Sequence, residues 1–442
     1  MTRLRAWWQN INASYWFLPA LFAGLALILA MVTIYLDRSG WSERLTDLPQ
    51  IIPARPEGAS NMLTVIAGSM IGVASTVFSI TIAAVAYASG NYGPRLLTNF
   101  MEDRGNQYSL ATFIATFVYA ITVLRSVRAE DEAAANIEDA VATSLPGFVP
   151  QLSLLVAYAL MGLSIAVLVF FLNHIPASIR INSVLKDIGA RLIAKVRKTF
   201  PDPDNGIEPE SRSEGEPVRA KANGYIQIID YERLSELAAK HERCLVMAVR
   251  TGDFVHRDMV LAHWSADGDG APVEGSEDEV HEALALGSRR TPGHDLQFLV
   301  DELVEIGLRA LSPGINDPFT AITALHWLGA ATAELGSRDL RIEANRADKN
   351  GDQFVVTLDG DFGHYVRRGF GSMRSGVATN RIAALAMFDA LLNARSSLDN
   401  ERRDALLREQ GELLMRQARE HLSGPELEAV DARFSSFERA FA

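Results

Sequence analysis

Four stretches of apolar residues constrain this chain more than any other feature. They run approximately from Trp16 to Leu36, Met62 to Ser89, Tyr108 to Leu124 and Leu152 to Leu172, and none contains Asp, Glu, Lys or Arg. A bilayer hydrocarbon core about 30 Å thick is crossed by roughly 20 apolar residues in a helix, because irregular backbone in lipid leaves N–H and C=O groups unpaired. The sequence therefore predicts four transmembrane helices, of which the third is the shortest and richest in Thr.

The chain divides into two parts that suit different solvents. Nearly all long apolar runs precede Asn173, whereas most of the charges, and the formal net charge of -12, belong to the remainder of the chain. This division predicts a membrane α-helical bundle of four transmembrane helices plus an α+β cytoplasmic domain with a small β-rich module and C-terminal helices. The pI near 5.3 argues against a nucleic-acid partner, because phosphate binding needs a clustered basic face.

Basic residues near the span ends predict the orientation in the membrane. Arg3 and Arg5 precede the first span, and Arg95 and Arg104 lie between the second and third. A basic helix after the fourth span carries Arg180, Lys186, Arg191, Lys195, Arg197 and Lys198. Because Lys and Arg stay on the cytoplasmic side during insertion, we expect a bacterial inner-membrane protein with both termini in the cytoplasm. A second interpretation is that these cations bind lipid headgroups, each adding about 1 kcal/mol of attraction.

The pattern along the chain predicts five regions. Residues 1–176 form the four-helix transmembrane domain, 177–200 a basic juxtamembrane helix, 201–217 a flexible linker, 218–265 a small β-rich, barrel-like module, and 277–442 a mainly helical cytoplasmic domain. The linker is assigned because it holds Pro, Asp, Glu, Gly and Ser with hardly any apolar residue. The pattern from Thr251 to Leu261 is similar to biotinyl- and lipoyl-carrier barrels but lacks their lysine between two Met, so a structural module is favoured.

Small residues recur on one face of the second span. The stripe consists of Ser69, Gly72, Thr76, Ser79 and Ala83, at spacings of three and four. Such a stripe lets helices approach closely, either inside the bundle or between protomers of a homo-oligomer. The same hydroxyl groups also suit the lining of a pore. The stripe contains no ionisable residue, which disfavours a proton-coupled transporter.

Two further motifs carry a resemblance. Tyr92, Pro94 and Arg95 form a membrane-border motif at the end of the second span, and Ala310 to Ala321 reads ALSPGINDPFTA. With the spacing of the spans, these motifs resemble a bacterial predicted membrane-protein family catalogued as domain of unknown function 2254. The resemblance covers most of the chain. It implies a bacterial inner-membrane location and the same two-part plan, and it brings no catalytic residue.

The second motif is interpreted as a rigid connector between two helices. It contains Ser312, Pro313, Gly314, Asn316, Asp317 and Pro318. Pro313 and Gly314 end the preceding helix, Asn316 suits a turn, Asp317 is placed to cap a new helix, and Pro318 suits its first position. The alternative is a ligand site lined by Asn316, Asp317, Thr320 and His326, although Asp317 would repel an anionic ligand.

Catalytic and metal chemistry find little support in the sequence. No triad, phosphate loop or dinucleotide fingerprint is present, so we expect no enzyme and no cofactor. Cys244 opens an apolar run and is interpreted as a buried small residue rather than a nucleophile. His294, Asp295, Asp301, Glu302 and Glu305 match no zinc spacing and are interpreted as a solvated acidic face, with no metal.

Three classes of function remain compatible with these features. The first is a homo-oligomeric channel or gated pore built around the second span and regulated by the cytoplasmic domain. The second is a non-conducting membrane scaffold or sensor that docks a cytosolic protein partner. A membrane-anchored enzyme ranks last.

Overall fold

The structure is a computed structural model that describes residues 14–39, 55–93, 103–128, 148–201, 214–265, 276–291, 293, 295–341 and 354–441. The chain separates into two compact units. The membrane unit contains the four long apolar helices, and the C-terminal unit extends from Arg180 to Ala442. Each unit has its own core.

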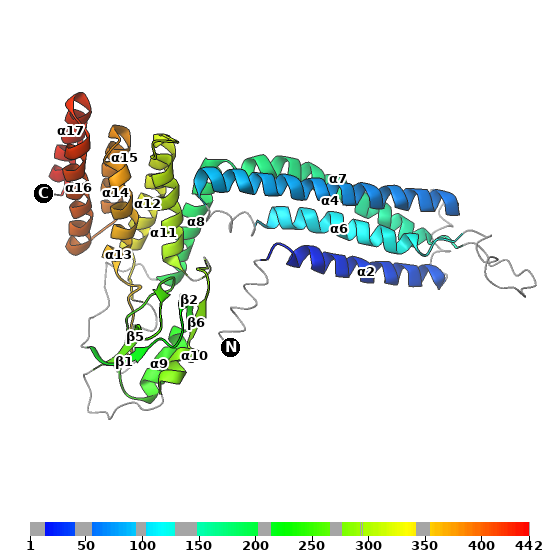
Figure 1. The fold of residues 1–442 in the computed structure, drawn as a ribbon, viewed down its shortest axis with the longest axis horizontal. Coiled ribbons are helices and arrows are strands. Elements are labelled where there is room, and N and C mark those ends of the chain that lie inside the picture. The colour runs from blue at the N-terminus through cyan, green and yellow to red at the C-terminus, as the bar shows by residue number, and fades with distance from the viewer. Residues whose placement is uncertain are drawn as a thin grey trace, which may run out of the picture. The chain divides into compact units, whose positions relative to one another are not determined.

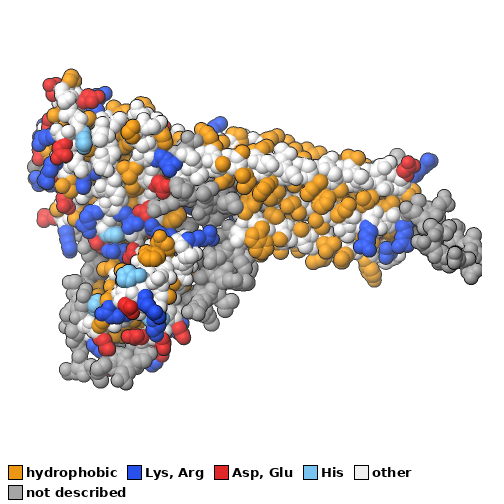
Figure 2. All heavy atoms as spheres, in the orientation of Figure 1, with side chains coloured by type: hydrophobic (Ala, Val, Ile, Leu, Met, Phe, Trp, Pro, Cys, Tyr) orange, Lys and Arg blue, Asp and Glu red, His pale blue; other side chains and the backbone are white. Residues whose placement is uncertain are grey.

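Four helices of the membrane unit are long and apolar enough to span a bilayer, which confirms the predicted spans. They are α2 (Phe17–Arg38), α4 (Pro56–Tyr92), α6 (Arg104–Leu124) and α7 (Gln151–Ser178), which lie side by side in Figure 1. Helices α2 and α6 pack closely, and Ala30 of α2 and Ala120 of α6 are fully buried in their shared core, where small side chains allow a close approach. On the face shown in Figure 2, hydrophobic side chains cover these helices between their ends.

The C-terminal unit is mainly helical and contains a small sheet-containing region (Figure 1). Its helices are α8 (Ile181–Thr199), α9 (Tyr231–Lys240), α10 (Ser276–Glu282), α11 (Leu296–Ala310), α12 (Pro318–Gly336), α13 (Phe362–Val366), α14 (Ser372–Val377), α15 (Arg381–Arg395), α16 (Glu401–His421) and α17 (Gly424–Ala440), with a π-helical turn η2 (Arg367–Gly371) between α13 and α14.

Helices α8, α12 and α15 run parallel to one another. Gly189 of α8 lies against the Trp327 ring of α12, and near their C-terminal ends Arg197 Nη2 donates to Glu334 Oε2 at 2.8 Å. On the other side of α12, Gly329 lies against Ala390 of α15. Glycines at these contacts permit the close approach, and the three helices begin at the same end of the layer.

Two small sheets make up the β-rich region. One has the order β1-β5-β3-β7 and the other β4-β2-β6. The strands are β1 (Glu214–Arg219), β2 (Gly224–Ile229), β3 (Leu245–Met247), β4 (Phe254–Val255), β5 (Val260–Ser265), β6 (Leu284–Gly287) and β7 (Val355–Val356). Their shared core includes Ile226, Leu261 and Trp264, and Cys244 is buried, as expected.

The strands extend past the region assigned to the β-rich module. Strand β1 begins inside the segment interpreted as a linker. This segment has few apolar residues of its own, but antiparallel pairing with β5 holds it as a strand. Strand β6 pairs with β2, and β7 pairs in parallel with β3, so both come from chain that follows residue 265. Residues 202–213 of the predicted linker lie outside the described residues.

Candidate functional site

The small-residue stripe lies on the outer face of α4. Large residues of α4, among them Leu63, Ile66, Met70 and Val77, enter the core of the membrane unit. Ser69, Gly72, Thr76, Ser79 and Ala83 are all exposed. A Cβ added at Gly72 would meet no atom within 4 Å. Within the part of the chain that the structure describes, the stripe therefore does not pack inside the bundle.

Two of the three hydroxyl groups of this stripe donate to backbone oxygens of their own helix. Thr76 Oγ1 donates to Gly72 O at 3.0 Å, and Ser79 Oγ donates to Ser75 O at 2.9 Å. A hydroxyl bonded back to its own helix needs no water. The face is therefore compatible with close helix packing as well as with a lumen. Of the membrane-border motif, Tyr92 ends α4, whereas Pro94 and Arg95 lie outside the described residues.

Three of the six cations in the predicted lipid-headgroup set face acids of their own unit. Arg191 Nε lies 3.0 Å from Asp187, and its Nη2 lies 3.7 Å from the buried Glu302. Arg197 pairs with Glu334. Burial lowers the pKa of Lys195 to about 8, against the opposing effect of Asp295 and Asp359. Exposed positions remain at Arg180, Lys186 and Lys198, for which lipid contact stays a prediction.

The ALSPGINDPFTA motif forms a tight connection between α11 and α12. Helix α11 ends at Ala310, and Asp317 N donates to Ala310 O at 2.7 Å. Asn316 has a φ of 47°, in the left-handed region that Asn tolerates. Asp317 caps α12 by accepting from Thr320 N at 3.2 Å and from Thr320 Oγ1 at 2.6 Å, with Pro318 in the first turn. These are the positions that the connector interpretation gave to Asn316, Asp317 and Pro318.

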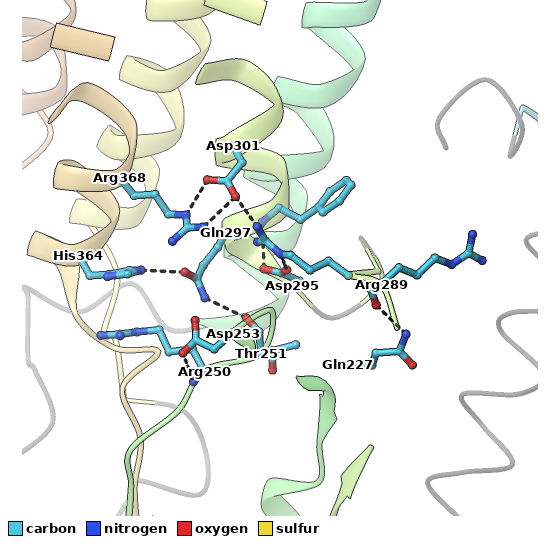
Figure 3. A network of polar contacts seen from close by, with 12 residues as sticks. Gln227, Arg250, Thr251, Asp253, Arg289, Asp295, Gln297, Asp301, His364 and Arg368 are labelled. Atoms are coloured by element: carbon cyan, nitrogen blue, oxygen red, sulfur yellow. Dashed lines mark hydrogen bonds and ion pairs between the residues drawn. The ribbon is translucent and has the colours of Figure 1, made fainter. Parts of the chain in front are cut away.

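An ionic network between the β-rich region and α11 is a polar site that the sequence patterns did not reveal (Figure 3). Asp301 of α11 accepts from Arg368 Nε at 2.6 Å and Nη2 at 2.8 Å, and also from Arg290 Nη1 at 2.5 Å. Arg290 Nε donates to Asp295 at 2.7 Å. Arg368 lies on η2, and such π-helical turns often occur at functional positions.

A second chain of contacts continues into the β-rich region (Figure 3). Gln297 Nε2 donates to Thr251 O at 2.9 Å, and Gln297 Oε1 lies 3.0 Å from His364 Nε2. Gly252, with a φ of 96°, lies so close to the Asp295 carboxylate that a side chain would overlap it. Arg250 Nε donates to Leu358 O at 3.0 Å. The network thus joins β-rich residues, α11 and α13.

Burial and neighbouring charges shift the pKa values in this network. Burial works against ionisation of Asp301, but hydrogen bonds from Arg368 and Arg290 outweigh it and lower its pKa. Burial, with help from Arg250 and Arg368, lowers the pKa of His364 to about 4. Burial raises the pKa of Asp359 to about 6. At neutral pH the network therefore holds charged arginines and the charged Asp301 carboxylate beside a neutral histidine.

The interpretation of α11 as a solvated acidic face is wrong for two of its members. Asp295 and Glu302 are each 1% exposed, and Asp301 is held by two arginines. His294 lies outside the described residues. Glu302 follows Leu299 by three residues and precedes Ile306 by four, so the spacing itself places it on the apolar face. Among the described residues, no three His, Cys, Asp or Glu side chains gather in a way that would hold a metal ion.

Polar side chains also hold the membrane unit together. At one end, Asp37 accepts from Leu152 N at 2.9 Å, Ser153 N at 3.0 Å and Ser153 Oγ at 2.7 Å, so it stabilises the N-terminus of α7. At the other end, Asp103 caps α6 and lies 2.9 Å from His174 Nε2. Both acids lie just outside the apolar stretches, which is why counting charges inside the spans did not find them.

A family model described as predicted membrane protein (DUF2254) matches residues 12–393. The chain belongs to this family. Uncharacterised proteins of Mycobacterium bovis and Mycobacterium tuberculosis are 28% identical to it over 418 residues, which is 92% of this chain and 76% of each relative. No solved structure matches the chain. The resemblance inferred from the two motifs is thereby confirmed.

Proposed function

We propose that this DUF2254 protein is a homo-oligomeric, channel-like protein of the bacterial inner membrane, not an enzyme. In this proposal the α4 helices of neighbouring copies meet along their small-residue stripes, both termini lie in the cytoplasm, and the C-terminal unit regulates the assembly. The observation that carries the proposal is the outward position of the stripe. Ser69, Gly72, Thr76, Ser79 and Ala83 are exposed, while Leu63, Ile66, Met70 and Val77 of the same helix enter the core.

A helix face made of small residues makes few van der Waals contacts with lipid but can make many with another helix. Exposed positions on other faces of α4, such as Ile71, Phe78 and Ile82, carry large apolar side chains. Helices in lipid associate through small residues, because these allow close van der Waals contact between backbones. From Ser69 to Ala83 the stripe spans about 21 Å at 1.5 Å per residue, most of a hydrocarbon core about 30 Å thick. A contact of this length suits a symmetric assembly of identical subunits.

The hydroxyl groups of the stripe would allow an assembly of α4 helices to conduct, because they can contact water inside a pore. If several α4 helices surround an axis, Thr76 and Ser79 can face it and release their backbone bonds to water. A narrow pore lined by small and weakly polar groups opens and closes by wetting and dewetting. The stripe has no fixed charge, so selectivity would come from pore width and from any charged ring at its ends.

Purified protein in planar bilayers tests this proposal. The parent protein should conduct, and Gly72→Leu should reduce both conductance and the oligomer population seen by native mass spectrometry. The added side chain pushes the helices apart and weakens each contact by about 1 to 3 kcal/mol.

Gly162→Leu is the matched control. Gly162 is exposed on α7, and a Cβ there also meets no atom within 4 Å, so the same substitution should leave assembly and conductance unchanged. A monomeric parent protein would contradict the proposal. An oligomer that stays silent across voltage, salt and membrane tension would also contradict it.

A silent oligomer would favour the alternative, a non-conducting scaffold or sensor that docks a cytosolic partner. The observation that supports this alternative is the ionic network of Asp301, Arg290 and Arg368. It ties the β-rich region to α11, so that a partner bound to one of them is coupled to the other. Co-purification of a stoichiometric partner from the native membrane is its test.

A further inference from the structure

Two large hydrophobic side chains are exposed on the connection between α11 and α12. Phe319 is 72% exposed and Ile315 is 43% exposed. Among the described residues of the C-terminal unit, Phe254 is the one other large hydrophobic side chain with comparable exposure. The connection is held by the Asp317 cap and by the hydrogen bond from Asp317 N to Ala310 O. Ile315 and Phe319 are therefore exposed on a turn that its own hydrogen bonds keep in place.

The contacts inside the C-terminal unit place this connection at the N-terminal end of α8. Helices α8 and α12 run parallel, with Gly189 against Trp327 and Arg197 against Glu334. In both pairs the two residue numbers differ by almost the same amount, as they must in parallel helices. The same difference places Phe319 of α12 level with Ile181 of α8. Packed helices have axes about 8 to 10 Å apart, which puts Phe319 within about one helix diameter of the start of α8.

The start of α8 cannot be far from the bilayer. Helix α7, which is long and apolar enough to span it, ends at Ser178, and α8 begins at Ile181. The two residues between them, Ile179 and Arg180, reach no more than about 3.5 Å each. The exposed Phe319 is therefore tethered close to the point where the chain leaves its last apolar helix.

The charges at this end of the helical layer suit an anionic surface. Arg180 precedes α8 and is exposed, and Arg381, exposed at the start of α15, lies level with Thr320 by the contact of Gly329 with Ala390. Asp317 in the connection keeps its negative charge while it caps α12, so two exposed arginines face one carboxylate that is turned onto its own helix. Aromatic and aliphatic side chains beside arginine are the combination that anchors protein surfaces at the lipid headgroup level.

We propose that the turn from Ser312 to Phe319 is a membrane-interface anchor, which inserts Ile315 and Phe319 among the headgroups of an anionic bilayer while Arg180 and Arg381 bind lipid phosphates. This gives the ALSPGINDPFTA motif a role beyond connecting two helices. It is independent of conduction, since a scaffold would use the same anchor.

Spin-label accessibility in lipid nanodiscs tests the anchor in the full chain. Phe319→Cys is labelled and compared with Ala330→Cys, an exposed site on the same helix and about 16 Å further along it. In bilayers containing phosphatidylglycerol, the label at 319 should collide several-fold more with oxygen relative to a water-soluble nickel chelate than the label at 330. The buried Cys244 should leave the unmodified protein unlabelled.

Lipid composition and charge variants identify the ligand. In pure phosphatidylcholine the difference in accessibility between positions 319 and 330 should shrink. The double variant Arg180→Gln with Arg381→Gln should shrink this difference in anionic bilayers too, because each lost charge lowers the partitioning of the turn into the headgroup layer by about fivefold. Equal nickel access at positions 319 and 330 in anionic bilayers would overturn the proposal. Shielding of position 319 from both oxygen and nickel would also overturn it, because it would show a protein neighbour.

Discussion

Asp359 illustrates, at the residue scale, how burial changes a side chain's chemistry. It lies between β7 and α13, and its Oδ2 accepts from Tyr231 Oη at 2.6 Å. Burial raises its pKa to about 6, against the hydrogen bond from Tyr231 and the charge of Arg250, and with help from Asp253 and Asp295. Between about pH 4 and pH 6 the folded chain keeps a proton that the unfolded chain has lost.

The sign of the resulting pH dependence follows from linkage. Because the folded pKa is raised, the free energy of unfolding falls as pH rises from about 4 to 6, and above pH 6 the full cost of burying the charge remains. Asp359→Asn stays neutral and keeps an acceptor for Tyr231, so it should be more stable than the parent at pH 7.5 by roughly 1 to 3 kcal/mol.

Denaturant unfolding of the detergent-solubilised chain at pH 7.5 and pH 4 measures this difference. It should become small at pH 4, where position 359 is neutral in both folded proteins. Comparing variant with parent at each pH cancels the separate titration of His364, whose low folded pKa costs stability as pH falls from about 6.5 towards 4. A variant less stable than the parent at pH 7.5 would mean that attraction to Arg250 exceeds the cost of burial.

At the scale of helices and strands, sequence reasoning succeeded where local chemistry decides the outcome. The four spans follow from apolar length alone, and the turn at Asn316 and Asp317 follows from backbone preferences and capping. It failed where distant residues decide. Strand β1 is ordered by pairing with β5, and Asp301 is ordered by arginines at positions 290 and 368. A single sequence does not show which distant residues will become such partners.

The α11–α12 connection gives an element-scale prediction. Asp317→Ala should lower the free energy of unfolding by about 0.5 to 2 kcal/mol, because Thr320 N loses its acceptor. Membrane insertion should be unchanged, since the four spans are untouched. Thermal unfolding of the solubilised full chain measures the loss.

Asp317→Asn is the matched control for this prediction, because an amide oxygen still caps the helix. It should retain most of the parent's stability. Unchanged melting of Asp317→Ala, combined with lost conductance or lost partner binding, would contradict the structural role and favour the ligand site considered for Asn316, Asp317, Thr320 and His326.

At the scale of the whole molecule, four spans require that the segment between α6 and α7 and the C-terminal unit face opposite sides of the membrane. The basic residues after α7, together with Arg95 and Arg104, favour the cytoplasm for the C-terminal unit. We therefore expect Glu132→Cys to react with a membrane-impermeant maleimide in intact spheroplasts. Position 132 lies outside the described residues, so the prediction rests on its place in the chain.

Ser396→Cys, at an exposed position after α15, should react in inside-out vesicles and stay unlabelled in spheroplasts. The unmodified protein should stay unlabelled in both preparations, because its single cysteine is buried. Labelling of both variants from the same side would mean that α7, the apolar helix that separates positions 132 and 396, does not cross the bilayer. Reversed labelling of both variants would contradict the orientation, since the basic helix after α7 would then face the periplasm. It would result from an inverted four-span bundle or from a bundle in which α6 does not cross, because the apolar window of α6 has the lowest mean hydropathy of the four, 1.5, and the largest share buried inside the protein.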